Sequence, residues 1–306
     1  MRPTPAGLRP RLPSPLTELD DPRFTAHGVR LLLKRDDLIH PALSGNKWRK
    51  LVPNLDAAAG RTVLTFGGAY SNHLRATAAA GRLLGFPTIG VVRGEELAHR
   101  PLNPSLARCA ADGMRLHFTD RTAYRAKTLP AGVDPAELYV VPEGGSNALA
   151  VRGAAELGRE LRDRTDVAAV AVGTGGTLAG LAAGLRTTQR ALGVPVLKGG
   201  FLGAEVRRLQ REAYGGGRGD WRLDERFHGG GYARTTPGLR EFARDFGDRH
   251  GLPLEHVYVA KLLHALTVLA GEGAFPPGTR VTAVVTGAPQ PWDTAGAAAG
   301  QPVPSR

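Results

Sequence analysis

Cysteine is almost absent from this sequence: Cys109 is the only one among 306 residues. A single cysteine cannot form an intrachain disulfide, so we expect a chain that works in a reducing compartment, the cytoplasm. We interpret Cys109 as a small buried core residue rather than a nucleophile. The nine histidines show no His-Glu-x-x-His spacing and there is no Cys-x-x-Cys, so we predict no catalytic metal.

Long apolar runs are missing as well. No stretch is long enough to span a bilayer, and residues 1–16 are rich in Pro and Arg without the apolar segment of a signal peptide. We therefore expect neither a membrane partner nor a secreted protein. The hydrophobic content of 42% and charged content of 22% fit an ordinary globular protein with room for two domains.

Lysine is scarce although the chain is strongly basic, with a formal net charge of +12. Only six of the 40 basic residues are lysines, and the arginines are spread along the chain, often beside acids as in 159–164. There is no block of five basic residues and no nucleic-acid recognition motif. We interpret the charge as a solvated Arg-rich surface that attracts small anions. Nucleic-acid binding is the weaker alternative, which a salt-dependent shift on random DNA would test.

Strand and helix signals alternate along the chain, which predicts βαβ units and the α/β class. A helix should begin near residues 44–46, the region 214–231 is Gly-rich and poorly periodic, and about 290–306 reads as a loose tail. The predicted strands are 29–33, 62–66, 88–92, 114–118, 138–141, 167–172, 196–202 and 281–285. The other predicted helices are 71–84, 104–111, 147–161, 177–191, 237–250 and 259–271.

Lys47 and Lys50 follow the Ser-Gly-Asn cluster at 44–46, in the first turns of the expected helix. Lysines three residues apart share one helical face, where they repel each other and the positive end of the helix dipole. An anion should lie beside them, or one amine should be neutral, as a Schiff-base lysine requires. For this pair alone, a solvated basic helix start is the alternative interpretation.

Gly67 and Gly68 follow the predicted strand 62–66 and precede Ser71, which should begin a helix. Two glycines allow a ligand to approach the backbone, and the free N–H groups of a helix start suit a carboxylate. The alternative is an ordinary strand–turn–helix connection with Ser71 as its N-cap.

A second glycine-rich turn, 173–177, follows the predicted strand 167–172 and precedes another helix. This arrangement lets backbone N–H groups surround a phosphate, although a plain tight turn is the alternative. A dinucleotide fingerprint would need glycine where Leu178 stands, and a P-loop sequence is absent. A cofactor with one phosphate needs one such turn.

Together these segments resemble the 1-aminocyclopropane-1-carboxylate deaminase / D-cysteine desulfhydrase family, over nearly the whole chain. Further matching segments are 34–37, 143–147, 227–232, 256–261 and 285–289. The resemblance implies pyridoxal 5'-phosphate as cofactor and fold type II, with two α/β domains, each a mostly parallel sheet flanked by helices, and the cofactor in the cleft between them. The small domain would be 45–150, inserted in a large domain of 1–44 plus 151–306.

The resemblance also implies roles at the cofactor. Lys47 would form the Schiff base and act as the catalytic base, and Lys50 would contact the phosphate. Asn72 would face the phenolic oxygen of the cofactor. The other implied cofactor-binding residues are Gly173, Thr174, Gly175, Gly176, Thr177, Val259 and Thr286.

For the substrate, the resemblance implies that Ser71 and Asn72 bind the carboxylate, with Ser71 also among the catalytic residues. His73 stands where the family usually has Gln, so a titratable group would enter that pocket. Tyr232 and Tyr258 would lie over the substrate side chain as acid–base candidates. The alternative is that both tyrosines pack in a core. Ser146 is expected to cap a helix.

Val259 departs from the family, which has Glu or Thr after this tyrosine, near the pyridine nitrogen of the cofactor. A carboxylate there would favour the protonated pyridine, a stronger electron sink. Valine cannot, so we expect a neutral pyridine unless Thr286 reaches the nitrogen. Opening a cyclopropane ring should then be beyond this protein, whereas elimination from Cβ remains open to it. A merely reshaped pocket is the alternative.

The resulting hypothesis is a pyridoxal-phosphate-dependent lyase or deaminase that converts a small amino acid to a 2-oxo acid and ammonia, closer to D-cysteine desulfhydrase than to 1-aminocyclopropane-1-carboxylate deaminase. The resemblance leads us to expect a homodimer. Two alternatives are an enzyme of a specialised biosynthetic pathway with a different amino-acid substrate and a cofactor-binding protein without turnover.

Overall fold

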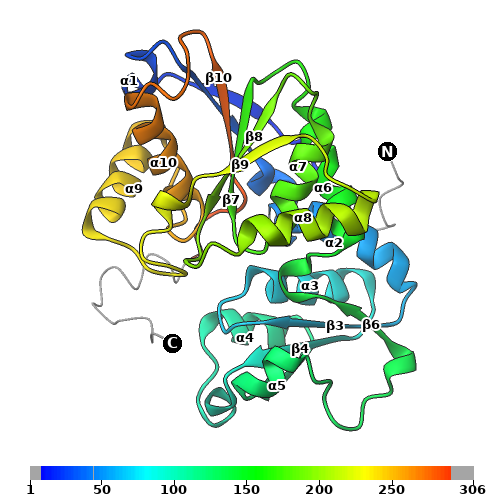
Figure 1. Cartoon of the computed structure of the whole chain (residues 1–306). Helices are drawn as coiled ribbons and strands as arrows, with labels where there is room; N and C mark the ends of the chain where they lie inside the picture. The colour runs from blue at the N-terminus through cyan, green and yellow to red at the C-terminus, as the bar shows by residue number, and fades with distance from the viewer. Residues whose placement is uncertain (1–7, 44, 291–306) are drawn as a thin grey trace.

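The computed structural model describes residues 8–43 and 45–290, whose strands form two separate sheets (Figure 1). The larger sheet takes strands from 16–34 and 167–284, and the smaller sheet takes strands from 62–141. No helix of the described ranges is long and apolar enough to cross a membrane. The predicted α/β class is confirmed.

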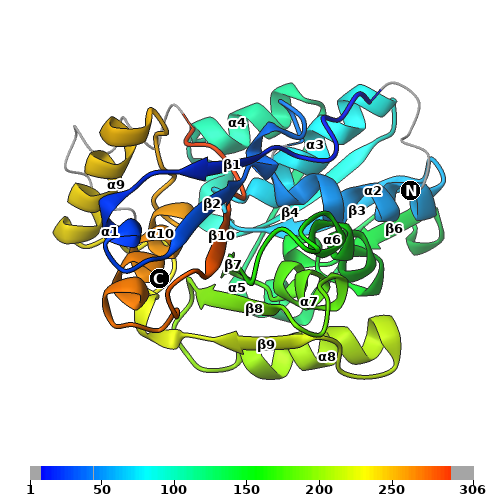
Figure 2. The same ribbon diagram turned by 90° about the horizontal axis from the view of Figure 1, so that it is seen from above.

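The larger sheet has six strands in the order β1-β2-β10-β7-β8-β9, which lie side by side in Figure 2. All neighbours are parallel except β1, which pairs antiparallel with β2 at the edge. The central strand reads Val-Ala-Ala-Val-Ala-Val, as expected for a parallel strand covered on both faces. The strands are β1 (Leu16–Leu19), β2 (Arg30–Lys34), β7 (Val167–Val172), β8 (Arg190–Pro195), β9 (Asp220–Leu223) and β10 (Arg280–Val284).

Helices cover both faces of this sheet and bury its side chains in two apolar clusters. One face carries α1 (Pro22–Thr25), α9 (Pro237–His250) and α10 (Val259–Gly271). The other face carries α6 (Ala148–Glu160), α7 (Gly176–Gly184) and α8 (Leu202–Tyr214). Five short 3-10 helices join the described elements: η1 (Asp36–Leu38), η2 (Glu95–His99), η3 (Pro135–Glu137), η4 (Glu143–Gly145) and η5 (Glu225–Phe227).

The smaller sheet has four parallel strands in the order β5-β4-β3-β6. Tyr124 packs on one face with Phe66, and the helices α2, α3 and α4 contribute to the clusters on the other. Its elements are β3 (Thr62–Gly67), β4 (Thr88–Arg93), β5 (Met114–Thr119), β6 (Leu138–Val141), α2 (Asn46–Ala58), α3 (Asn72–Leu84), α4 (Pro104–Ala111) and α5 (Arg121–Ala126).

Helix α2 connects the two units. Its apolar side chains, Leu51 and Leu55 among them, join the cluster of the smaller sheet. Its Arg49 is buried and forms ion pairs with Asp36, which follows β2, and with Glu160 at the end of α6. The helix that carries both lysines is therefore fixed to both sheets.

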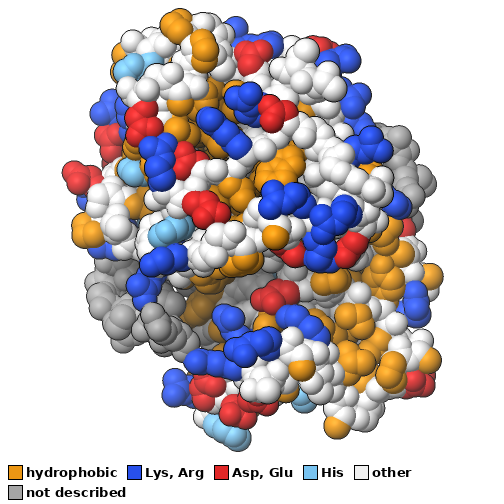
Figure 3. All heavy atoms as spheres, viewed as in Figure 1, with side chains coloured by type: hydrophobic (Ala, Val, Ile, Leu, Met, Phe, Trp, Pro, Cys, Tyr) orange, Lys and Arg blue, Asp and Glu red, His pale blue; other side chains and the backbone are white. Residues whose placement is uncertain are grey.

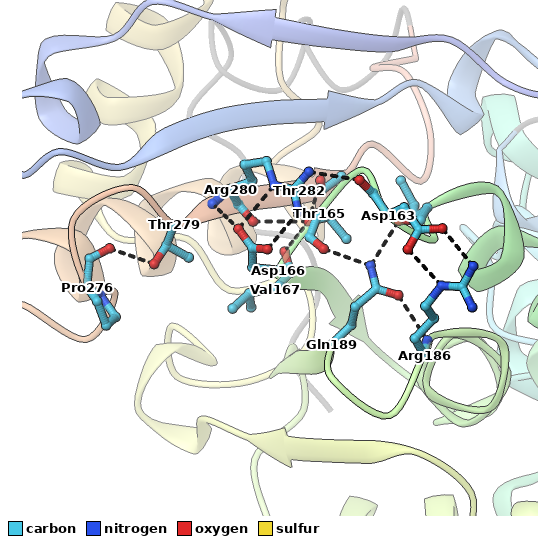
Figure 4. Close-up of polar contacts among 11 residues, drawn as sticks. Asp163, Thr165, Asp166, Val167, Arg186, Gln189, Pro276, Thr279, Arg280 and Thr282 are labelled. Atoms are coloured by element: carbon cyan, nitrogen blue, oxygen red, sulfur yellow. Dashed lines mark hydrogen bonds and ion pairs between the residues drawn. The ribbon is translucent and has the colours of Figure 1, made fainter.

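A polar network joins the strands of the larger sheet at the edge where its parallel strands begin (Figure 4). Arg280 pairs with Asp166 at 2.8 Å, and Arg186 pairs with Asp163 at 2.7 Å. Gln189 donates to the carbonyl oxygens of Leu161 and Thr165. These bonds fix the turn that leads into β8.

Two predictions about the larger sheet were wrong. The predicted helix 177–191 ends at Gly184, and the predicted strand 196–202 is replaced by β8 at Arg190–Pro195. Helix α8, which the sequence analysis did not predict, follows β8 after residues 196–201. Strand β9 lies in the region 214–231, which was predicted to be poorly periodic. The remaining predicted elements occur within two residues of their predicted bounds.

The domain boundaries at 45 and 150 remain our proposal. The two sheets are consistent with them, but α2 packs extensively against α6 as well as within the smaller unit, so that no clean border runs at residue 45. The predicted tail, about 290–306, lies outside the described residues except for Gln290, and so do residues 1–7 and Ser44.

Candidate active site

The first turn of α2 lies against the loop that follows β10. Gly45 has φ +62°, and a Cβ there would lie 1.7 Å from the backbone oxygen of Thr286. Only glycine therefore fits at this crossing. Asn46 donates from Nδ2 to Oγ1 of Thr177 at 2.9 Å. These contacts fix the first turn of α2, which carries Lys47, against two loops of the larger sheet.

Lys50 points toward the segment that connects β6 to α6. Its ammonium donates to the backbone oxygen of Gly144 and to Oγ of Ser146, the latter at 2.8 Å. Burial lowers the pKa of Lys47 to about 8. Burial and the neighbouring Lys47 charge lower the pKa of Lys50 well below its usual range. Within the described residues no carboxylate pairs with either amine, so the site favours an anion.

The glycine-rich turn 173–177 lies beside Lys50. Gly175 has φ +78° and precedes the first turn of α7. A Cβ on Gly176 would lie 2.7 Å from Oγ of Ser146 and 3.3 Å from Cε of Lys50. Oγ of Ser146 also lies 2.6 Å from Oγ1 of Thr174. A lysine, two hydroxyl groups and the start of a helix thus converge, which is a suitable donor set for a phosphate.

Ser71 begins α3 at the carboxyl end of β3, where Gly67 allows close packing: a Cβ there would lie 2.7 Å from Oγ of Ser71. Oγ of Ser71 accepts from the backbone N–H of Leu74 at 3.2 Å, so the serine is a helix N-cap. Oδ1 of Asn72 accepts from Arg75, which leaves the amide nitrogen of Asn72 to act as a donor.

His73 is buried, with 1% of its surface exposed, and its ring lies under Gly145. The Thr65 hydroxyl donates to the backbone oxygen of Val141, so Nε2 of His73 carries the proton and donates to Thr65. Burial and the charges of Lys47 and Lys50 lower the pKa of His73 well below its usual range. The expected titratable group is therefore a neutral imidazole packed behind the site.

Tyr232 and Tyr258 meet with their rings nearly perpendicular and their centroids 6.2 Å apart. Tyr258 lies against the glycine-rich turn, since a Cβ on Gly173 would be 3.4 Å from its ring. The Glu255 carboxylate accepts from the backbone N–H groups of Val257 and Tyr258 and so orients this turn. Burial and Tyr232 raise the pKa of Tyr258 well above its usual range, so Tyr258 keeps its proton at neutral pH.

Val259 is 1% exposed and packs in the apolar cluster beneath α10. It offers neither a charge nor a hydrogen bond to the site. Thr286 lies against Gly45 through its backbone oxygen. The position of Val259 relative to the cofactor remains a prediction.

Two functional candidates were missed. Ser146 was expected to cap α6, but Asn147 is the N-cap, with its Oδ1 accepting from the backbone N–H of Ala150. Ser146 instead bonds to Lys50 and Thr174. Gly144, at φ +64°, brings its carbonyl to Lys50. The match of 143–147 to the family could have pointed to these residues. An anion site needs donors from more than one loop, and this loop supplies some of them.

The space-filling view is hollowed between the two units, and Lys and Arg side chains gather on the rim of the smaller one (Figure 3). The described residues contain no group of three or more His, Cys, Asp or Glu side chains placed to hold a metal.

A family model described as pyridoxal-phosphate dependent enzyme matches residues 9–287 of this chain. The chain belongs to this family. The match spans nearly all described residues, including α2, the start of α3 and the turn 173–177. Pyridoxal phosphate is thus the cofactor, and the protein is an enzyme of fold type II.

Curated relatives carry two names. A putative 1-aminocyclopropane-1-carboxylate deaminase of Pyrococcus furiosus is 31% identical over 297 residues, covering 85% of each chain. A D-cysteine desulfhydrase of Klebsiella pneumoniae is 36% identical over 199 residues, covering 56% of this chain and 58% of the relative. A solved structure titled as an ACC deaminase homologue matches with a TM-score of 0.77 at 27% identity, covering 90% of this chain and 89% of the other. The family resemblance inferred from the sequence is confirmed.

The residues of the site fit pyridoxal phosphate. Its phosphate requires cationic and N–H donors, which Lys50 and the start of α7 supply. Its aldehyde requires an amine that is readily deprotonated, and Lys47, with a pKa of about 8, has that property.

Proposed function

We propose that this enzyme eliminates or deaminates a small amino acid to give a 2-oxo acid and ammonia. The observation that supports this most is the pair of lysines in the first turns of α2 without a carboxylate partner in the described residues, with Lys50 beside the turn 173–177. The alternative within the same family is a different amino-acid substrate in a specialised pathway.

In this proposal Lys47 would hold the cofactor through its amine and would move a proton at Cα or Cβ of the substrate. Pyridoxal phosphate, when bound, supplies the electron sink that makes such a proton removable. A lysine with a pKa of about 8 is matched to this task, because it is partly neutral near neutral pH and can accept a proton.

Lys50 and the turn 173–177 would hold the phosphate, together with the hydroxyl groups of Ser146 and Thr174. Lys50 would exchange its bond to Gly144 for a charge-assisted one. Val259 and Thr286 would border the ring of the cofactor. The anion would also restore the ordinary protonation of Lys50, whose pKa is lowered by burial and by Lys47.

Ser71 and Asn72 would bind the substrate carboxylate at the start of α3, where backbone N–H groups and the helix dipole favour negative charge. Asn72 would also donate to the phenolic oxygen of the cofactor. The neutral His73 supports this helix turn from behind, so we propose that it contributes to the substrate pocket through packing.

Tyr232 and Tyr258 would face the substrate side chain. Tyr258 keeps its proton because its pKa is raised, so it would donate a hydrogen bond to a leaving group. Tyr232 is 44% exposed and lies at the open side of the pair, where it would exclude water once a substrate is bound.

We expect the wild-type enzyme to convert D-cysteine or β-chloro-alanine and to leave 1-aminocyclopropane-1-carboxylate unchanged. Valine at 259 gives the ring nitrogen no charged partner, so carbanion stabilisation is weaker than with a carboxylate there. Elimination of a good leaving group from Cβ needs less carbanion stabilisation than opening a cyclopropane ring does. The measurement is 2-oxo acid and ammonia release from these substrates and from L-cysteine. Efficient conversion of 1-aminocyclopropane-1-carboxylate would contradict the assignment.

Ser71→Ala should raise KM or lower kcat/KM while leaving cofactor absorption intact. Losing one charge-assisted donor costs about 1.5–3 kcal/mol, or roughly 10- to 150-fold in kcat/KM. Because Ser71 is also an N-cap, Asp120→Ala, which removes the cap of α5, serves as the control for lost capping alone. An unchanged kcat/KM would remove Ser71 from the site.

We further propose that the enzyme works in the cytoplasm as a homodimer. The single cysteine supports a reducing compartment, and the family resemblance supports the dimer. Sedimentation of the purified protein would test the oligomeric state directly.

A further inference from the structure

Lys261 is a buried lysine outside the cofactor site. It lies in the first turn of α10 with 1% of its surface exposed. Its ammonium donates to the backbone oxygens of His228 and Gly231, both at 2.8 Å. Two bonds from one cation to one loop hold that loop at two points.

The loop that Lys261 contacts has little conformational preference of its own. Gly229, Gly230 and Gly231 have φ values of +64°, +92° and +126°, which side-chain-bearing residues rarely adopt. Glycine gives up more backbone entropy on ordering than other residues, so three in succession need an outside constraint. A Cβ on Gly229 would lie 3.1 Å from Cε of Lys261, so the loop packs directly on the lysine.

The two tyrosines of the site lie at the two ends of this contact. Tyr232 follows the three glycines, and Tyr258 precedes the helix that carries Lys261. The rings of the two tyrosines meet edge to face. The lysine therefore fixes one tyrosine relative to the other.

Keeping a cation here is costly. Burial lowers the pKa of Lys261 to about 8, although the nearby Glu255 opposes that shift. An apolar side chain would fill a core position without this desolvation. What an apolar side chain cannot do is bind two carbonyl oxygens.

We propose that Lys261 is a positioning residue that holds Tyr232 over the substrate side chain by binding the loop 228–231. This inference rests on the proposed function for the role of Tyr232. The contact itself is a property of the chain and can be measured separately.

Lys261→Met is the test, with Lys198→Met as the control because Lys198 is exposed. We expect kcat to fall about 10- to 100-fold, the usual effect of a misplaced group, with KM changed far less. Cofactor absorption should stay at the wild-type value, since Lys47 and Lys50 are untouched. In the Tyr232→Phe background, Lys261→Met should lower kcat little further, because the residue acts through Tyr232.

Hydrogen exchange of the peptide containing 228–232 provides a second readout, independent of turnover, and it should accelerate in Lys261→Met alone. If Lys261→Met does not fold, Gly229→Ala is the second variant, because its added Cβ would push the loop away from Lys261. We expect the same loss of kcat and the same faster exchange.

Unchanged kcat and unchanged hydrogen exchange in the tested variant would overturn the proposal. So would a fall in kcat on Lys261→Met that is as large in the Tyr232→Phe background as in the wild type. A wild type that converts none of the tested amino acids contradicts only the proposed function, since the exchange measurement still decides the loop contact.

Discussion

Lys47→Ala is expected to abolish the visible absorption of the bound cofactor and nearly all turnover. The variant loses both the amine that links the cofactor and the base that moves the proton, and a positioned base alone contributes about 10²- to 10⁴-fold. The neighbouring Lys50 cannot replace it, because its ammonium donates to Gly144 and Ser146 beside the turn 173–177. The measurements are the absorption spectrum, its loss on borohydride reduction, and release of 2-oxo acid.

Two controls separate this effect from a general loss of charge. Lys198→Ala removes an exposed lysine far from α2 in sequence and should keep both colour and activity. Peptide mapping of borohydride-treated wild type should place the reduced cofactor on Lys47. A Lys47→Ala protein that stays yellow, with a reducible link on another lysine, would show that the central assignment is wrong.

Arg49→Met is expected to give the largest loss of stability. Arg49 is bidentate to Asp36 at 2.8 Å and bidentate to Glu160 at 2.9 Å. Removing one partner of a buried pair leaves charge uncompensated and costs about 3–5 kcal/mol of unfolding free energy. Among the described residues, Lys34, 2.6 Å from Glu160, and Ser14, bonded to Asp36, would still face the two carboxylates. Urea unfolding measures the loss.

Arg30→Met is the matched control, because Arg30 pairs with Glu18 in an arrangement that is half-exposed on both sides. Exposed pairs contribute little, so its unfolding midpoint should stay close to that of the wild type. Arg49→Met should also weaken cofactor binding, since Arg49 lies between Lys47 and Lys50 on α2. If both arginine variants unfold at the same urea concentration, the buried network does not stabilise α2 as argued.

The sequence could predict the parts of this fold that are local. Alternation and glycine-rich turns located β3, β7 and the starts of α3 and α7, because strand ends and helix starts carry their own signals. The run from Thr177 to Ala191 looked like one helix, but α7 ends at Gly184. Gln189 then fixes the following turn by binding the carbonyl oxygens of Leu161 and Thr165. Such long-range bonds leave no local pattern, and the register of β8 followed the same error.

The candidate site shows a similar division. Lys47, Lys50, Ser71 and the turn 173–177 could be proposed because each lies in a recognisable segment. For Ser146 the family match of 143–147 was the one signal, since its link to Lys50 spans 96 residues and depends on how β6 is placed beside β3. The neutral state of His73 also depends on burial beneath Gly145, which composition and spacing do not reveal.

Because lysine is scarce and mostly buried, few side-chain amines of the folded enzyme can react with a labelling reagent. Lys34, Lys50 and Lys261 are enclosed by protein, and Lys47 is half-buried, so Lys127 and Lys198 are the two exposed side-chain amines. Acylating reagents do not react with guanidinium groups at neutral pH, so a surface charged by arginine is hardly modified by them. Labelling of the folded enzyme should modify these two lysines first. Removal of the cofactor should then add a third modified lysine, and we expect peptide mapping to identify it as Lys47.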